Sequence, residues 1–146
     1  MAKLLFDIVT AERLVSSEEV DVIVAPGIDG ELTLLPSHAS LMTILKPGEV
    51  RVVNNSEERL IVVSGGFLEV IGNKVTILAD TAERVEEIDL ERAEAAFKRA
   101  EERATSATGD QDLERALASM RRSQVRLKVA RRQRRGNRAD AVGPPS

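Results

Sequence analysis

The hydrophobic pattern of this chain changes near residue 88, and that change limits what the chain can fold into. Before it, short runs rich in Val, Ile, Leu and Thr are separated by turn-forming stretches such as PGIDG, KPG, NNSEE and GN. Many short strands without a helical period between them are typical of an antiparallel sandwich or a flattened barrel. After it, Ala, Glu, Lys and Arg dominate, which favours helices. We therefore expect a β-domain followed by a helical one.

Six segments of the first half are predicted to form strands, and they end before residue 82. They are LLFDIVT, VDVIVAP, ELTLLP, EVRVV, RLIVVSGGFLEVI and KVTILAD. In the last of them Val75 and Ile77 alternate with Thr76 and Leu78, as in a strand with one buried face. The Gly65-Gly66 pair within a strand pattern predicts a bulge or a sharp bend.

Two helices are predicted after the change. The first runs from Asp89, a plausible N-cap, to Thr105 and carries one narrow apolar stripe. The second runs from about 113 to 135 with Asp112 as its cap, and GNRADAVGPPS after it reads as a disordered end. A short link between them predicts an antiparallel hairpin. The stripes are largely Ala, which contributes little on burial, so both a moving hairpin and a static one remain open.

Several classes of chemistry find no support in the composition. The chain has no Cys and one His, His38, so metal binding is poorly supported. It has no GxSxG elbow and no phosphate-binding P-loop, and we expect no enzyme. No apolar run approaches the roughly 18–20 residues that span a membrane, and the N-terminus lacks the pattern of a signal peptide. A soluble or peripheral protein is expected.

Charge is distributed unevenly along the chain. Residues 1–82 carry a net charge of -6, residues 83–120 carry -5 and residues 121–146 carry +8, although the whole chain carries only -3. A basic helix of this kind suits nucleic acid, another acidic partner or the acidic first helix. The chain has no Trp, no Tyr and three Phe, so stacking platforms for single strands are absent. The alternatives stay open at this point.

Spacing groups five charged residues of the two predicted helices. Arg92 follows Asp89 by three residues and precedes Arg99 by seven, while Arg122 and Arg126 are four apart. If the hairpin folds back on itself, these guanidinium groups converge with one carboxylate. Arginine forks suit phosphate oxygens, but the same residues can form intramolecular salt bridges. A phosphate site and an internal ion-pair network are both consistent with the pattern.

Together the segments resemble a known family. VIVAPGIDGELTLLPSHASLMTILKPGEVRV, SGGFLEV and VTILADTAE are similar to the β-domain of the epsilon subunit of bacterial F-type ATP synthases, and IDLERA, at 88–93, is similar to the motif that opens its helical hairpin. The resemblance covers about residues 3 to 133. The basic stretch after residue 133 extends past the usual end of that hairpin.

The resemblance implies the domains and the function. Residues 1–84 would form a β-sandwich of about ten strands, 88–135 a regulatory hairpin and 136–146 a disordered tail. The protein would be a non-catalytic rotor subunit of the central stalk, coupling proton flow to ATP synthesis. It would contact the gamma subunit, the ring of c subunits and the alpha and beta subunits of the head, and no nucleic acid. It would sit peripherally on the cytoplasmic side of the bacterial plasma membrane, held only through the complex.

The resemblance also implies three groups of site residues. An ATP molecule, as a regulatory ligand rather than a required cofactor, would bind Glu83, Ile88, Asp89, Arg92, Arg99, Arg122 and Arg126. We expect the contacts that inhibit ATP hydrolysis to include Arg121, Arg122, Arg126, Arg131, Arg132, Arg134 and Arg135. The interface with the c-ring and gamma would include Gly30, Glu31, Pro36 and His38. No metal ligand is expected.

Overall fold

The computed structural model describes residues 2–141, with side chains as far as residue 133. The chain forms two compact units, Met1–Arg84 and Val85–Ser146, and each is described by itself.

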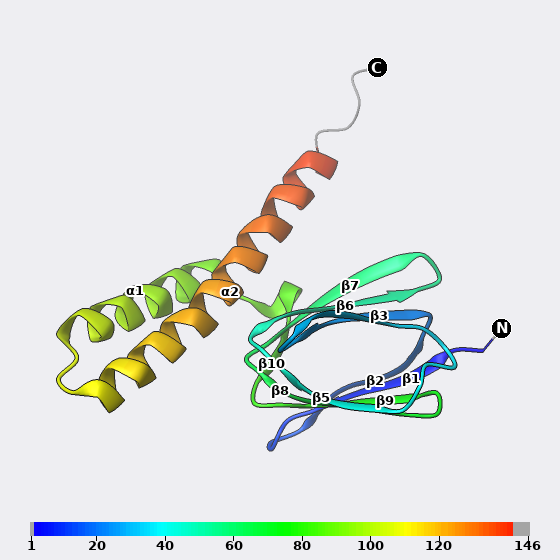
Figure 1. The fold of residues 1–146 in the computed structure, drawn as a ribbon. Helices are drawn as coiled ribbons and strands as arrows, with labels where there is room; N and C mark the ends of the chain where they lie inside the picture. Colours follow the sequence, from blue (N-terminus) through cyan, green and yellow to red (C-terminus); the bar gives the residue numbers. More distant parts are fainter. Residues whose placement is uncertain (1, 142–146) are drawn as a thin grey trace. The chain divides into compact units, whose positions relative to one another are not determined.

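The first unit is a ten-stranded sheet folded into a sandwich. Its strands are β1 Leu4–Val9, β2 Leu14–Val20, β3 Val22–Gly27, β4 Gly30–Leu34, β5 Leu41–Leu45, β6 Gly48–Asn54, β7 Glu57–Val63, β8 Gly66–Ile71, β9 Lys74–Ala79 and β10 Ala82–Arg84. Their order is β10-β7-β6-β3-β5-β8-β9-β1-β2, with β4 paired to β3. Figure 1 shows β3, β6 and β7 in one layer and β1, β5 and β9 in the other. The predicted β-sandwich is confirmed, with one parallel pair, β1 and β9.

The core lies between the two layers and follows the alternation of each strand. Leu4, Phe6 and Ile8 of β1 are fully buried, and Val75 and Ile77 of β9 are too. The intervening residues of β9 point outward, and Leu78 is 55% exposed. The predicted period of two in KVTILAD is therefore confirmed. Since apolar burial stabilises by about 25 cal/mol per Å², these alternating side chains hold the layers together.

The Gly65-Gly66 pair forms the sharp bend that the sequence predicts. β7 ends at Val63 and β8 begins at Gly66, and both glycines have positive φ, 120° and 142°. A Cβ on Gly66 would lie 2.1 Å from the carbonyl oxygen of Leu78. The backbones of β8 and β9 approach each other too closely there to leave room for a side chain at position 66.

The six predicted segments do not account for all ten strands. β2 has the sequence LVSSEEV, whose polar residues hide its alternation, and only its last residue falls in a predicted strand. β5 directly follows the loop that contains His38, and no strand was predicted for its residues. β10 was also missed, because it is only three residues long. These strands are fixed by pairing with their neighbours in the sheet rather than by a local signal.

The second unit is a helical hairpin. A 3-10 turn, η1 Val85–Glu87, precedes α1 Leu90–Ser106 and α2 Asp110–Ala141. Asp89 caps α1 as predicted, since its Oδ1 accepts hydrogen bonds from the backbone N–H groups of Glu91 and Arg92 at 3.0 and 3.2 Å. Figure 1 shows the two helices side by side, joined by the short turn. The predicted antiparallel hairpin is confirmed.

The second helix is longer than predicted at both ends. It begins at Asp110, directly after Gly109 with its φ of 91°, so Asp112 lies inside the first turn rather than at the cap. It continues through residues 136–141, which the sequence assigned to a disordered tail; residues 142–146 of that tail lie outside the described part. Arg and Ala are good helix formers, and a single Gly136 costs only about 1 kcal/mol in a helix interior. The tail prediction is therefore corrected for residues 136–141.

Candidate functional site

One flank of the hairpin carries the predicted arginine group. On α1, Arg92 and Arg99 each stand one position before a buried alanine, Ala93 or Ala100, so both lie on the same side of the stripe. On α2, Arg126 stands one position before the buried Leu127. In an antiparallel pair of helices such corresponding flanks face one another. Arg122, four residues before Arg126, lies on that flank too.

The short turn between the helices sets the register of the group along the hairpin. Counting back from Ser106, the end of α1, and forward by the same number of residues from Asp110, the start of α2, places Arg92 level with the stretch between Arg122 and Arg126. At 1.5 Å per residue, Arg99 lies about 10 Å nearer the turn than Arg92. We call these four arginines the arginine row.

Three of these four arginines have no carboxylate partner among the side chains that the structure describes. Arg92, Arg99 and Arg122 make no salt bridge and no side-chain hydrogen bond within the described part of the chain. Arg131, on the opposite flank, does pair with Glu94. An internal ion-pair network was the alternative to a phosphate site, and for these three arginines no such pair is formed in the described residues. Within the described residues the positive charge of these three arginines is not compensated by a carboxylate, which suits an anion.

The remaining members of the predicted ATP site have structural roles of their own. Asp89 caps α1 through Oδ1. Ile88 is half-buried, and its backbone N–H donates to the carbonyl of Val85 at 3.2 Å. Glu83 belongs to the β-unit, in β10, opposite Val62 of β7. Six of the seven residues therefore belong to the helical unit and one to the sandwich.

The arginines assigned to inhibition all lie on α2. Arg121, Arg122, Arg131 and Arg132 are exposed, and Arg126 is half-buried. Arg134 and Arg135 belong to the same helix, but their side chains lie outside the described residues. In this structure Arg131 pairs with Glu94, so that pair competes with contacts to another protein.

The predicted interface residues of the sandwich lie in and next to β4. Gly30, with φ of 137°, and Glu31 start β4 opposite Gly27 and Pro26 of β3. Pro36 and His38 lie in the loop that follows, where His38 is half-buried and its Nδ1 lies 2.7 Å from the carbonyl oxygen of Ala39.

Sequence reasoning missed an exposed apolar row on the outer face of the sandwich. The pairings Ile44–Phe67, Phe67–Leu78, Leu78–Val9 and Val9–Leu14 place five apolar side chains in line across β5, β8, β9, β1 and β2. Phe67 is 54% exposed and Leu14 is 58% exposed. The signal was present in LMTIL and KVTILA, where large apolar residues also occupy outward positions. A continuous apolar surface of this kind marks a binding interface.

Three further observations bear on the kind of site present. Within the described residues, no group of His, Cys, Asp or Glu could hold a metal ion. No helix in that part of the chain is both long and apolar enough to cross a bilayer. The described pockets include two on the hairpin, one of about 410 Å³ beside Phe97 and one of about 320 Å³ at its turn.

These features define a two-part adaptor: a β-sandwich with an apolar binding face, followed by a hairpin with a basic flank. Residues 3–85 match the family described as ATP synthase, Delta/Epsilon chain, beta-sandwich domain. Residues 86–131 match the family described as ATP synthase, Delta/Epsilon chain, long alpha-helix domain. The chain therefore belongs to the delta/epsilon chain family of ATP synthases, and the resemblance seen in the sequence is confirmed.

Individual relatives agree with this assignment. The chain is 56% identical over 136 residues to the ATP synthase epsilon chain of Dehalococcoides mccartyi, covering 92% of this chain and 97% of the relative. It is 50% identical over 128 residues to the epsilon chain of Herpetosiphon aurantiacus, covering 88% and 94%.

Solved structures show the same fold at low identity. A chain of the Euglena gracilis mitochondrial ATP synthase, from its OSCP, F1 and c-ring structure, superposes with a TM-score of 0.74 at 22% identity, covering 86% of this chain and 79% of that one. A chain of the Tetrahymena thermophila mitochondrial ATP synthase, from its central stalk and c-ring structure, superposes with a TM-score of 0.62 at 19% identity. The match covers 88% of this chain and 97% of that one.

Proposed function

We propose that this protein acts as the epsilon subunit of a bacterial F-type ATP synthase, in the central stalk that couples rotation to ATP synthesis. The observation that carries the proposal is the pair of consecutive family matches, 3–85 and 86–131, over both structural units. The chain itself would be non-catalytic and would need no cofactor. It would be peripheral to the plasma membrane on the cytoplasmic side, held there only through the complex.

The apolar row is the surface that we assign to the gamma subunit. It crosses five strands and presents Phe67 and Leu78 to solvent, which suits a stable protein partner more than transient contact. Gly30, Glu31, Pro36 and His38 lie in the loop and strand assigned to the c-ring. Exposed Ile28 and Leu35 flank them and add apolar contact area.

A docking experiment tests this assignment. Phe67→Asp places a charge in the middle of the row, and we expect at least a tenfold loss of affinity for the gamma–c-ring complex. Leu113→Asp changes an exposed apolar residue of the hairpin instead and serves as the matched control. Unchanged docking of Phe67→Asp would refute the assignment of the apolar row to gamma.

The hairpin is proposed to inhibit ATP hydrolysis by contacting acidic regions of the alpha and beta subunits. The basic residues of α2 support this, since electrostatic complementarity steers such contacts. The same charge suits nucleic acid, but an acidic protein partner accounts for it within the family. Replacing Arg121, Arg122, Arg126, Arg131, Arg132, Arg134 and Arg135 with Ala should relieve the inhibition. Hydrolysis as slow as with the unchanged chain would contradict it.

ATP is proposed to bind the arginine row and to favour the folded hairpin. Arg92, Arg99 and Arg122 have no competing carboxylate within the described residues, which supports binding of a triphosphate. A ligand that binds one state better shifts the population toward that state, so ATP would oppose inhibition. Arg92→Gln should weaken ATP binding to the isolated chain about tenfold or more, whereas Lys98→Gln, elsewhere on α1, should not. Equal affinities would refute this site.

A further inference from the structure

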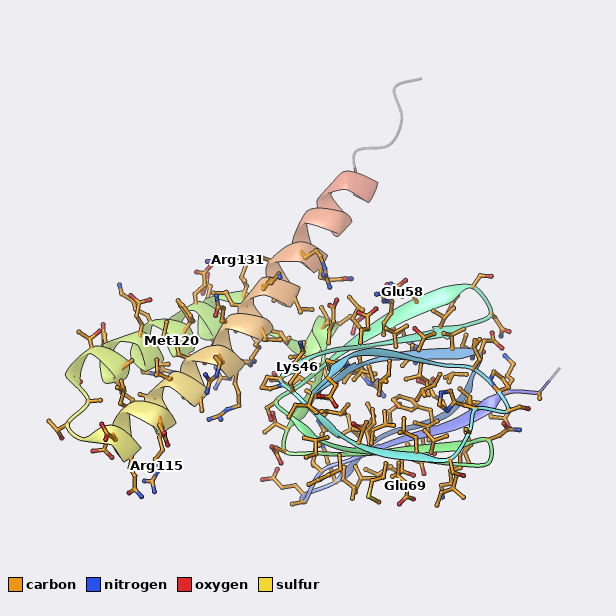
Figure 2. All side chains as sticks on the ribbon, viewed as in Figure 1. Lys46, Glu58, Glu69, Arg115, Met120 and Arg131 are labelled. Atoms are coloured by element: carbon orange, nitrogen blue, oxygen red, sulfur yellow. The ribbon has the colours of Figure 1, made fainter. Side chains whose placement is uncertain are left out.

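The turn end of the hairpin carries a pocket that the proposed function does not use. It lies between the end of α1 and the first turns of α2, with a volume of about 320 Å³. Figure 2 shows Arg115 at this end of the hairpin. Its charged and hydroxyl-bearing lining consists of Arg103, Ser106, Thr108, Asp112, Arg115 and Ser119. We propose that this pocket binds a phosphate-type oxyanion between Arg103 and Arg115.

The two arginines are the main reason. Both are exposed, both line the same pocket, and neither makes a salt bridge or side-chain hydrogen bond within the described residues. Asp112 lines the pocket too, yet it forms no salt bridge with either of them. Two guanidinium groups around one cavity repel each other, and a doubly charged oxyanion between them removes that repulsion. Their planar forks match the oxygens of a phosphate group.

Hydroxyl groups complete the lining. Thr108 and Ser119 make no hydrogen bond through their side chains within the described part of the chain, so their hydroxyls can donate to an anion. Ser106 differs, because its hydroxyl already donates to the carbonyl of Glu102 at 3.0 Å. The pocket also adjoins the start of α2, whose helix dipole adds a favourable contribution that Asp110 and Asp112 partly offset.

The phosphate group can come from two sources. One is free inorganic phosphate. The other is the terminal phosphate of a nucleotide held by the arginine row, since Arg103 follows Arg99 by one helical turn, about 6 Å along the axis. The pocket uses none of the residues of the proposed ATP site, so only the nucleotide source rests on that proposal, and binding of free phosphate stands even if it fails.

Titration calorimetry of the full-length chain with inorganic phosphate tests the site. Arg103→Gln and Arg115→Gln should each weaken binding about tenfold, because each removes a charged hydrogen-bond donor. Lys98→Gln removes one positive charge from α1 outside the pocket and should leave the dissociation constant unchanged. Asp112→Asn should tighten binding about two- to fivefold, because it removes a carboxylate from the lining. Unchanged affinity in both arginine variants would overturn the proposal.

A second set of measurements separates the two sources. If free phosphate is the ligand, Arg92→Gln leaves phosphate binding unchanged and Arg103→Gln leaves ATP binding unchanged. If the ligand is the terminal phosphate of a nucleotide, Arg103→Gln weakens ATP binding but not AMP binding. In both cases phosphate or ATP should shift the backbone amide resonances of Ser106, Thr108 and Ser119 in the unaltered chain. The absence of any such shift would overturn the proposal. This measurement uses the unaltered chain, so it does not depend on the correct folding of a variant.

Discussion

Gly66 is the residue on which the crossing from β7 to β8 depends. Its φ is 142°, and a Cβ there would meet the carbonyl of Leu78 at 2.1 Å. We expect Gly66→Ala to lower the free energy of unfolding by more than about 2 kcal/mol, because it adds both backbone strain and a clash with main chain. Gly72→Ala is the control, since its φ is 59° but nothing lies within 4 Å. Denaturant unfolding should show a clearly smaller loss of unfolding free energy for Gly72→Ala than for Gly66→Ala. Equal losses in the two variants would contradict this account.

Asp89 has an observed role as helix cap and a proposed role in ATP binding, and two substitutions separate them. Asp89→Ala should destabilise the hairpin by about 1 kcal/mol, because the N–H groups of Glu91 and Arg92 lose their acceptor. Asp89→Ser keeps a capping oxygen and should preserve the helix while removing the charge. Helicity by circular dichroism, measured beside ATP affinity, checks both roles. Loss of helicity in Asp89→Ser would show that the charge, not the cap, matters.

Asp21, between β2 and β3, links stability to pH. Its carboxylate accepts a hydrogen bond from the backbone N–H of Asn55 at 2.9 Å and pairs with Lys3 at 3.3 Å. The hydrogen bond from Asn55, with help from Lys3, lowers the pKa of Asp21 below its ordinary value of 3.8. Because the folded-state pKa is lowered, this stabilisation is present above about pH 4 and is lost as pH falls through the folded pKa.

The substitution Asp21→Asn tests this linkage. At neutral pH it should lower the melting temperature, because the charged acceptor and the pair with Lys3 are lost. The difference from the unaltered chain should shrink as pH falls below 3.8. A difference that stays constant with pH would show that the charge of Asp21 contributes nothing.

At the scale of elements, the hairpin is held by small side chains. Ala93 and Ala100 are the fully buried residues of α1, while Leu90, Ala96 and Phe97 are only half-buried. Since the burial of Ala yields less than that of Leu or Val, local opening should cost less in α1 than in the sandwich. Hydrogen exchange should therefore be faster in α1 than in β3 and β6. Equal protection would favour a static hairpin, the alternative that the sequence left open.

The elements also show which local sequence patterns are sufficient to predict a strand or a helix. β9 was predicted because Val75 and Ile77 alternate cleanly, and α1 because Asp89 caps a stripe of period 3.6. β2 was missed because Ser16, Ser17 and Glu18 hide its register, which is fixed by pairing with β1 across the sheet. The end of α2 was placed too early because Gly136 reads as a stop although neighbouring Arg and Ala favour the helix.

At the scale of the whole molecule, the candidate sites depend on contacts between elements. Arg92, Arg99, Arg122 and Arg126 could be grouped from helical spacing alone. That the first three have no carboxylate partner among the described residues could not be predicted from spacing. The apolar row requires the register of five strands, of which β2 and β5 were not predicted. The pocket at the turn requires the register of the hairpin. Spacing within one element is encoded locally, whereas pairing and charge balance arise only when elements pack.

The central claim is that the sandwich docks while the hairpin restrains hydrolysis. The most direct test is ATP hydrolysis by the reconstituted head and gamma subunit, with the full chain and with a version ending at Glu87, over a range of ATP concentrations. We predict that both versions bind, that only the full chain inhibits, and that its inhibition weakens as ATP rises. Equal hydrolysis rates with the two versions at every ATP concentration would contradict the claim.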